Sequence, residues 1–225
     1  KSAFIPADFL SDAKLSEIEG MYIPFFLYDF DCHYDIRATG SKIRTWRSGN
    51  YEYTETSLYQ VERDATIDFE KLPVDASIAM PDEAMDLIEP YDYKALEDFQ
   101  TKYMSGFFAE KYNMDATELG PRAKDKAKAD AKAIMNKTVT GYSTITNRTD
   151  NVTMDEKKAD YALLPVWCYS YKYKGKDYLF KMNGQTGKIV GKPPVSWARV
   201  WGYGATVFGC TSAILAMIML LAEVL

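Results

Sequence analysis

The sequence contains a single histidine, His33, and three widely separated cysteines, Cys32, Cys168 and Cys210. A Ser/His/Asp triad would depend on that one histidine, and no Gly-x-Ser-x-Gly motif is present to expose a nucleophilic serine. The cysteine spacing excludes a Cys-x-x-Cys metal pair and a disulfide framework, which favours a reducing compartment. We therefore expect no enzyme, no catalytic residue and no metal site. The 32 acidic residues leave an unrecognised hydrolase with paired carboxylates as an alternative.

The sequence also lacks a strong charge bias, a signal peptide and a complete phosphate-binding loop. Its formal net charge is -5, which gives no global reason to expect nucleic-acid binding. The chain starts at Lys1 without a charged and apolar leader, so we expect a fragment whose natural N-terminus is missing. The NGQTGK stretch at 183–188 fails the phosphate-loop pattern at Met182 and Ile189, and Asn183-Gly184 is instead typical of a hairpin turn.

Charged residues are absent from a long stretch near the C-terminus. Residues 200–222 form about 23 uncharged, mostly apolar positions, and a helix of that length reaches about 34 Å, enough to cross a hydrocarbon core of about 30 Å. Trp197, Trp201 and Tyr203 lie at its start, as is typical of a lipid headgroup region. The sequence therefore predicts a transmembrane anchor over residues 197–225, with one span or a hairpin of two left open.

The residues before this anchor indicate its orientation. Lys188, Lys192 and Arg199 precede the apolar stretch, and positively charged flanks favour the cytoplasmic side of a membrane. We therefore expect a cell-membrane protein whose soluble part, residues 1–196, lies in the cytoplasm.

The soluble part predicts an α+β fold in which antiparallel β regions flank a central group of helices, followed by the transmembrane helix. The β-rich regions are expected at about 20–75 and 140–191, with a turn at Ser48, Gly49 and Asn50. The helical region is expected at about 81–138, with helices at 81–90, 93–112 and 121–138. A stripe of Leu96, Phe99, Tyr103 and Phe107 predicts a core-facing side for the second of these helices. A short helix is also expected at 8–19.

Two rows of side chains on predicted strands invite functional hypotheses. In the first, alternation places Phe30, Cys32, Tyr34 and Ile36 on one face and Asp29, Asp31 and His33 on the other. The acidic row could contribute to a metal site only with ligands from elsewhere, so we interpret it as a solvated face. In the second, Trp167, Tyr169, Tyr171 and Tyr173 form an aromatic row that could stack on bases, but core or partner contact is favoured because no basic row accompanies it.

The predicted helix at 121–138 carries most of the local positive charge. With Asp125 and Asp130 its net charge is +4, enough to attract RNA or anionic lipid weakly, although a solvated face is the simpler interpretation. Ala123, Ala127, Ala131, Ile134 and Met135 predict its buried side. The basic side chains are Arg122, Lys124, Lys126, Lys128, Lys132 and Lys137.

Several segments together resemble the C-terminal region of bacterial membrane proteins with N-terminal TFIIB-type zinc ribbons, a family common in Firmicutes. The segments are IEGMYIPFFLYDF at 18–30, LPVDAS at 72–77, EPYDYKALEDFQ at 89–100, LLPVW at 163–167 and FKMNGQTGKIVGKPPVS at 180–196. The resemblance covers nearly the whole chain. The cysteine-rich ribbons are absent, so zinc is an expectation only for a missing N-terminal region and for no residue of this sequence.

The resemblance implies a protein partner. A similar protein in Bacillus is encoded beside a phage-shock A type protein and a flotillin-like protein, and helps to bring the former to the membrane. We therefore expect a membrane-tethered cytoplasmic adaptor or scaffold in envelope-stress or membrane-organising assemblies, without catalysis and with no small-molecule substrate identified. The alternatives are a nucleic-acid-associated protein that uses the basic helix 121–138, which the overall acidity disfavours, and the hydrolase.

Overall fold

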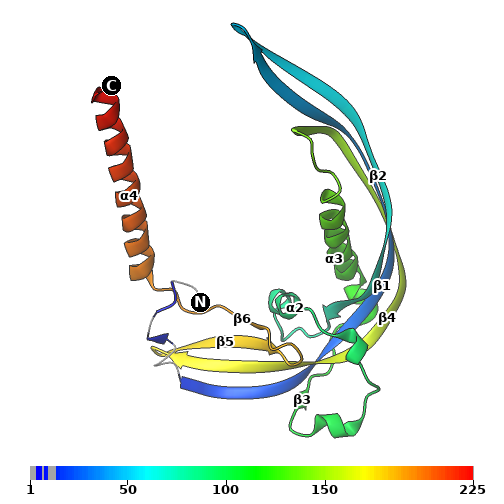
Figure 1. Ribbon diagram of the computed structural model, residues 1–225. Helices are drawn as coiled ribbons and strands as arrows, with labels where there is room; N and C mark the ends of the chain where they lie inside the picture. The colour runs from blue at the N-terminus through cyan, green and yellow to red at the C-terminus, as the bar shows by residue number, and fades with distance from the viewer. Residues whose placement is uncertain (1–3, 7, 10–13, 225) are drawn as a thin grey trace. The chain divides into compact units, whose positions relative to one another are not determined.

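Long antiparallel strands dominate the computed structural model, which describes residues 4–6, 8–9 and 14–224 (Figure 1). The strands in chain order are β1 Lys14–Ser48, β2 Tyr51–Asp75, β3 Phe108–Ala109, β4 Thr144–Tyr173, β5 Lys176–Asn183 and β6 Ile189–Gly191. The helices are α2 Asp82–Ile88, α3 Ala116–Asn136 and α4 Trp197–Val224, with 3₁₀ turns η1 Tyr93–Ala95 and η2 Thr101–Met104.

The predicted arrangement, in which two β regions flank a central group of helices, is wrong. The strands form one sheet in the order β2-β1-β4-β5-β6, and β3 pairs with β1. The two β regions are therefore neighbours in the same sheet, because β1 of the first region pairs with β4 of the second. Alternation of apolar and polar residues shows which side chains of a strand share a face. It contains no information on a pairing partner about 100 residues away.

The chain divides into two compact units, residues 21–165 and residues 1–20 with 166–225, and β1 and β4 belong to both. In the first unit β1 and β2 form a long hairpin whose turn lies at the predicted place but contains only Gly49 and Asn50, with Gly49 at φ +60 and Ser48 opposite Tyr51. A glycine at the first turn position suits a turn that follows the twist of the strands. The hairpin register shifts once, between Tyr28 and Phe30.

Helix α3 packs on one face of the strongly curved sheet of residues 21–165 (Figure 1). Asp115 and Glu118 form a capping box that starts the helix at Ala116, earlier than predicted. Four of the five residues predicted to be buried are buried, whereas Ile134 is 44% exposed. The alanines at 123, 127 and 131 let the helix backbone approach Tyr28, Phe30 and Cys32 of β1.

The helix predicted at 93–112 is also wrong, whereas the short helix predicted at 81–90 is present as α2. Residues 93–112 form the turns η1 and η2 and the strand β3, with Gly106 at φ +83. Asp92 accepts a hydrogen bond from the Lys94 backbone and so closes a single turn rather than capping a helix. Of the expected core stripe, Leu96 and Phe99 are exposed, Phe99 at 63%, and Tyr103 and Phe107 are half-buried.

The second unit contains the end of β4, the strands β5 and β6, and α4 (Figure 1). The short helix expected at 8–19 is contradicted at 14–19, where β1 begins, while residues 10–13 lie outside the described residues. The side chain of Phe9 packs on the rings of Tyr173 and Tyr178 at 5.2 and 5.7 Å. The aromatic row of β4 is therefore half-buried or buried at Trp167, Tyr169, Tyr171 and Tyr173.

Helix α4 agrees with the predicted C-terminal apolar helix. Residues Trp197–Met219 form a segment long and apolar enough to cross a membrane, with a mean hydropathy of 1.5 and no part buried in the protein. Its exposed apolar side chains include Trp201, Phe208 and Leu215. Such a surface is unfavourable in water, which supports membrane association.

Candidate functional site

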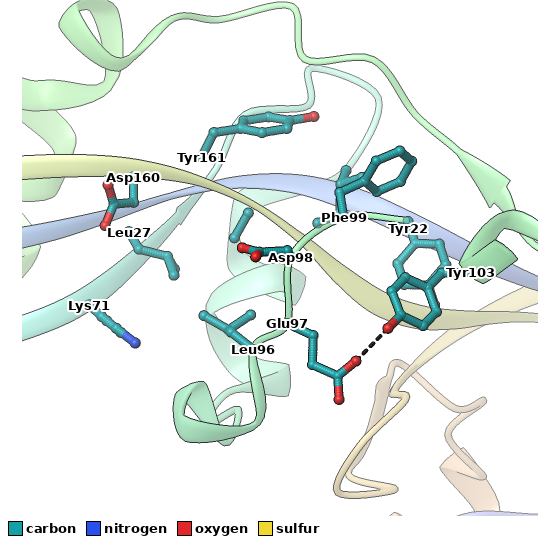
Figure 2. A pocket seen from close by; sticks show the side chains of 12 residues that line it. Tyr22, Leu27, Lys71, Leu96, Glu97, Asp98, Phe99, Tyr103, Asp160 and Tyr161 are labelled. Carbon is teal, nitrogen blue, oxygen red and sulfur yellow. Dashed lines mark hydrogen bonds between the residues drawn. The ribbon is translucent and has the colours of Figure 1, made fainter. Parts of the chain in front are cut away.

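The main pocket of residues 21–165 lies between the sheet and the irregular segment 93–107, and has a volume of about 630 Å³ (Figure 2). We call it the aromatic pocket. β1 contributes Tyr22 and Leu27, and β4 contributes Asp160 to Leu163. The irregular segment contributes Leu96, Glu97, Asp98, Phe99 and Tyr103, and β2 contributes Lys71. The stripe predicted as helix core therefore forms one wall of a pocket.

A β-bulge positions Lys71 at one end of this pocket (Figure 2). Lys71 has φ +56, and its backbone N–H donates to the Asp29 carboxylate at 2.7 Å. A left-handed lysine is strained, and the Asp29 hydrogen bond replaces the ladder bond that the bulge removes. The Lys71 ammonium donates to the Tyr93 carbonyl at 3.3 Å, which ties β2 to the irregular segment.

Carboxylates surround the aromatic walls of the pocket. The Tyr103 hydroxyl donates to Glu97, and this bond raises the pKa of Tyr103 (Figure 2). The Asp160 carboxylate lies 2.5 Å from the Lys158 ammonium, while Asp98 is exposed at the rim. Aromatic walls with carboxylates at the rim suit a ligand that combines an apolar part with a positive charge.

The lining of the aromatic pocket offers apolar and charged side chains that can bind a ligand, and its residues form no known catalytic arrangement. Its described residues include no serine, cysteine or histidine that could act as a nucleophile beside a base. Among the residues that the structure describes, no three His, Cys, Asp or Glu side chains gather in a way that could hold a metal ion.

The row of Asp29, Asp31 and His33 does not converge on a common point. Asp29 receives the Lys71 N–H, Asp31 lies 2.5 Å from the Lys157 ammonium, and His33 lies 3.6 Å from Asp64. Each side chain thus contacts a different neighbour on the outer face of the sheet.

Two of the five basic side chains of α3 form internal ion pairs. Arg122 lies 2.9 Å from Asp75 and 3.3 Å from Asp82, and Lys126 lies 2.7 Å from Glu89. Both also approach Asp86, at 3.5 and 2.8 Å. This network joins α3 to α2 and to the end of β2. It therefore neutralises part of the surface that the nucleic-acid hypothesis requires.

Burial perturbs the acids of this ion network. It raises the pKa of Glu89 to about 7, against the opposing effect of Lys126, and it raises the pKa of Asp75 despite Arg122. Perturbed carboxylates are common at functional sites, but ion-pair networks that hold elements together perturb them as well. Since Arg122 and Lys126 are each paired with several acids, the network holds α2, α3 and the end of β2 together.

The sequence did not identify the aromatic pocket as a site. Leu96, Phe99 and Tyr103 were singled out, but as helix core, and Lys71, Asp98 and Asp160 carried no signal of their own. An amphipathic helix also allows Asp98 to precede Phe99, so the sequence of segment 89–100 contains no local signal that distinguishes a pocket wall from a core helix.

A comparison with curated proteins finds a relative in Bacillus subtilis (strain 168), described as the uncharacterized protein YdjG. It is 40% identical over 221 residues, which cover 98% of this chain and 65% of that protein. The chain thus spans less than two thirds of the length of the relative. No protein-family model matches the chain, and no solved structure matches it.

Proposed function

We propose that the chain is a membrane-tethered cytoplasmic adaptor that uses no catalytic step. The observation that carries this proposal is α4, a helix long and apolar enough to cross a membrane and without any buried part. The basic residues Lys188, Lys192 and Arg199 before it support a cytoplasmic position for the folded residues.

The aromatic pocket is the binding site in this proposal. Its walls of Tyr22, Phe99 and Tyr161 accept an apolar group, and the exposed Asp98 carboxylate accepts a neighbouring positive charge. A segment of a partner protein with a basic side chain beside apolar ones meets both requirements. The resemblance to zinc-ribbon membrane proteins suggests a phage-shock A type protein as that partner, with a flotillin-like protein as a further member of the assembly.

The tether is tested by membrane fractionation of the full chain. We expect the chain to remain in the membrane pellet after an alkaline carbonate wash, and an Ile214→Lys, Leu215→Lys double variant to be released. A Glu52→Cys variant tests the side, because a membrane-impermeant maleimide should label the introduced thiol only after cell lysis. Release of the wild-type chain by the wash would reject the tether.

The adaptor role is tested by co-purification with a co-expressed phage-shock A type protein. We expect Phe99→Ala and Asp98→Asn each to reduce recovery of the partner several-fold, because they remove a wall and a rim charge of the pocket. Tyr51→Ala is the matched control, since Tyr51 is 72% exposed and lies at the hairpin turn. Equal recovery with all three variants would reject the pocket as the binding site.

A further inference from the structure

A second cavity, of about 610 Å³, lies in the unit formed by residues 1–20 and 166–225, beside the start of α4. We call it the juxtamembrane pocket. Its lining includes three basic side chains, Lys174, Lys176 and Arg199, and one carboxylate, Asp8. Lys172 and Lys188, which are close in sequence, do not line it. The pocket therefore concentrates positive charge at the end of the helix that the proposed function places in the membrane.

The backbone holds the basic residues toward this pocket at some conformational cost. The β4–β5 turn consists of Lys174 and Gly175, at φ 49 and 75. Both positions of such a turn favour glycine or asparagine, so a lysine at the first is unusual. The Lys174 ammonium lies 2.9 Å from Asp8 and 4.9 Å from the ring centre of Tyr173. The Arg199 guanidinium donates to the Ile5 carbonyl at 2.8 Å.

Tyr173 supplies a second observation that indicates a ligand. This side chain lines the pocket and is only 5% exposed, and its hydroxyl lies beside the Asp8 carboxylate and the Lys174 ammonium without a well-aligned hydrogen bond to either. Its ring is held edge-on against Phe9 at 5.2 Å. Buried phenol hydroxyls normally hold a well-aligned partner, so an acceptor that enters the pocket can compete with Asp8 for this donor.

We propose that the juxtamembrane pocket binds the phosphodiester group of an anionic phospholipid headgroup. Lys174, Lys176 and Arg199 provide the positive charge, and the Tyr173 hydroxyl donates to a phosphate oxygen. The assignment of this phosphate group to a lipid rests on the proposed function, in which α4 crosses the membrane and Trp197 and Trp201 mark the headgroup level. A basic pocket at that level meets the anionic lipids of the cytoplasmic leaflet.

Lipid titration of the full chain in an uncharged detergent tests this proposal. Short-chain phosphatidylglycerol is added, and bound lipid is followed by native mass spectrometry and tryptophan fluorescence. We expect saturable binding of phosphatidylglycerol and much weaker binding of phosphatidylcholine and inorganic phosphate. Lys176→Gln and Arg199→Gln should each weaken binding about fivefold, as expected for one basic residue near an anionic surface.

The control variant is Lys172→Gln, which removes the same charge from an exposed position of the same hairpin. It should leave the affinity unchanged. An equal loss for Lys172→Gln and Lys176→Gln would show diffuse attraction and overturn the pocket. Binding of inorganic phosphate as tight as that of the lipid would overturn the lipid source.

Tyr173→Phe separates a binding role from a structural one. Because the contacts of the hydroxyl with Asp8 and Lys174 are poorly aligned, its removal should change thermal stability little, while the affinity for phosphatidylglycerol falls. Unchanged affinity would remove Tyr173 from the site. The carbonate wash described above reports on the tether alone, so a chain that stays in the membrane but does not distinguish the lipids contradicts only the headgroup proposal.

Discussion

The two halves of the β1–β2 hairpin differ both in sequence pattern and in surroundings. On one face, Cys32, Tyr34 and Ile36 lie under α3 and are at most 1% exposed. Farther along β1 the same face carries Lys42, Arg44 and Trp46, all of them exposed. Tyr142 marks the boundary, because its ring lies against Gly40 so closely that a β-carbon there would collide with it.

The apolar side chains of the first half are therefore matched by cover from α3, whereas the second half carries basic side chains and lies beyond the helix. Beyond Gly40 the aromatic side chains contact one another and nearby cations. Trp46 stacks on Tyr53 at 5.6 Å, and the Arg44 guanidinium lies 5.6 Å from the Trp46 ring. Such exposed contacts contribute little, whereas the covered half loses its apolar surface from water.

The largest expected effect compares two aromatic residues on this face. Phe30→Ala should destabilise the fold by about 3–5 kcal/mol, because Phe30 is 1% exposed and stacks on Tyr28 in the α3 core. Trp46→Ala, the matched change in the uncovered half, should cost no more than about 1 kcal/mol. Urea unfolding of the full chain in detergent, followed by circular dichroism, measures both. Similar losses of unfolding free energy in the two variants would contradict the difference between the covered and the uncovered half.

An intermediate effect is expected where α3 is fixed to the end of β2. Asp75→Asn should cost about 2 kcal/mol, because it removes the buried partner of Arg122 but leaves Asp82 and Asp86 in place. Asp82→Asn is the control. Its side chain is 58% exposed, so the loss should stay within about 0.5 kcal/mol. The same urea series measures this pair, and an equal cost for the two would mean that burial of Asp75 is unimportant.

The smallest effect is a pH dependence. The pKa of Glu89 is raised from 4.5 to about 7 in the folded protein, so protonation favours the folded state. This contribution is complete below about pH 4.5 and is lost as the pH rises through about 7. Glu89→Gln should flatten the pH dependence by on the order of 1 kcal/mol. Melting temperatures from pH 5 to 8 test it, and an unchanged slope would contradict the assignment.

Sequence patterns predicted those elements whose periodicity is local. The alternation from Phe30 to Ile36, the alanine side of α3 and the apolar α4 are all present. The order of the sheet was not predictable, because β4 contacts β1 through residues such as Thr146 and Thr39, which are 107 positions apart. The stripe at Leu96, Phe99 and Tyr103 has helical spacing, but the segment forms separate turns around a pocket.

For the candidate sites, too, single residues could be noticed in the sequence but their long-range contacts could not be predicted. Arg199 and Tyr173 were each noticed, one as a charged flank and the other as part of an aromatic row. Nothing local connects them, since they come together only through the β4–β5 turn and the start of α4. The position of Lys71 likewise depends on a β-bulge. The bulge is held by a hydrogen bond from the Lys71 N–H to Asp29, which lies 42 residues earlier in the sequence.

The two-residue turn at Gly49 also has a kinetic consequence. It lets β1 and β2 pair with almost no loop to close, so this hairpin is expected to form early, on a timescale of about 1–10 µs for its first contacts. Strand β4 must then reach β1 across the intervening α2 and α3 segments, which requires closing a loop of roughly 100 residues. Docking of α3 and β4 onto the preformed hairpin is therefore the expected slow step of folding, and until it occurs Phe30 and Tyr34 are exposed to water.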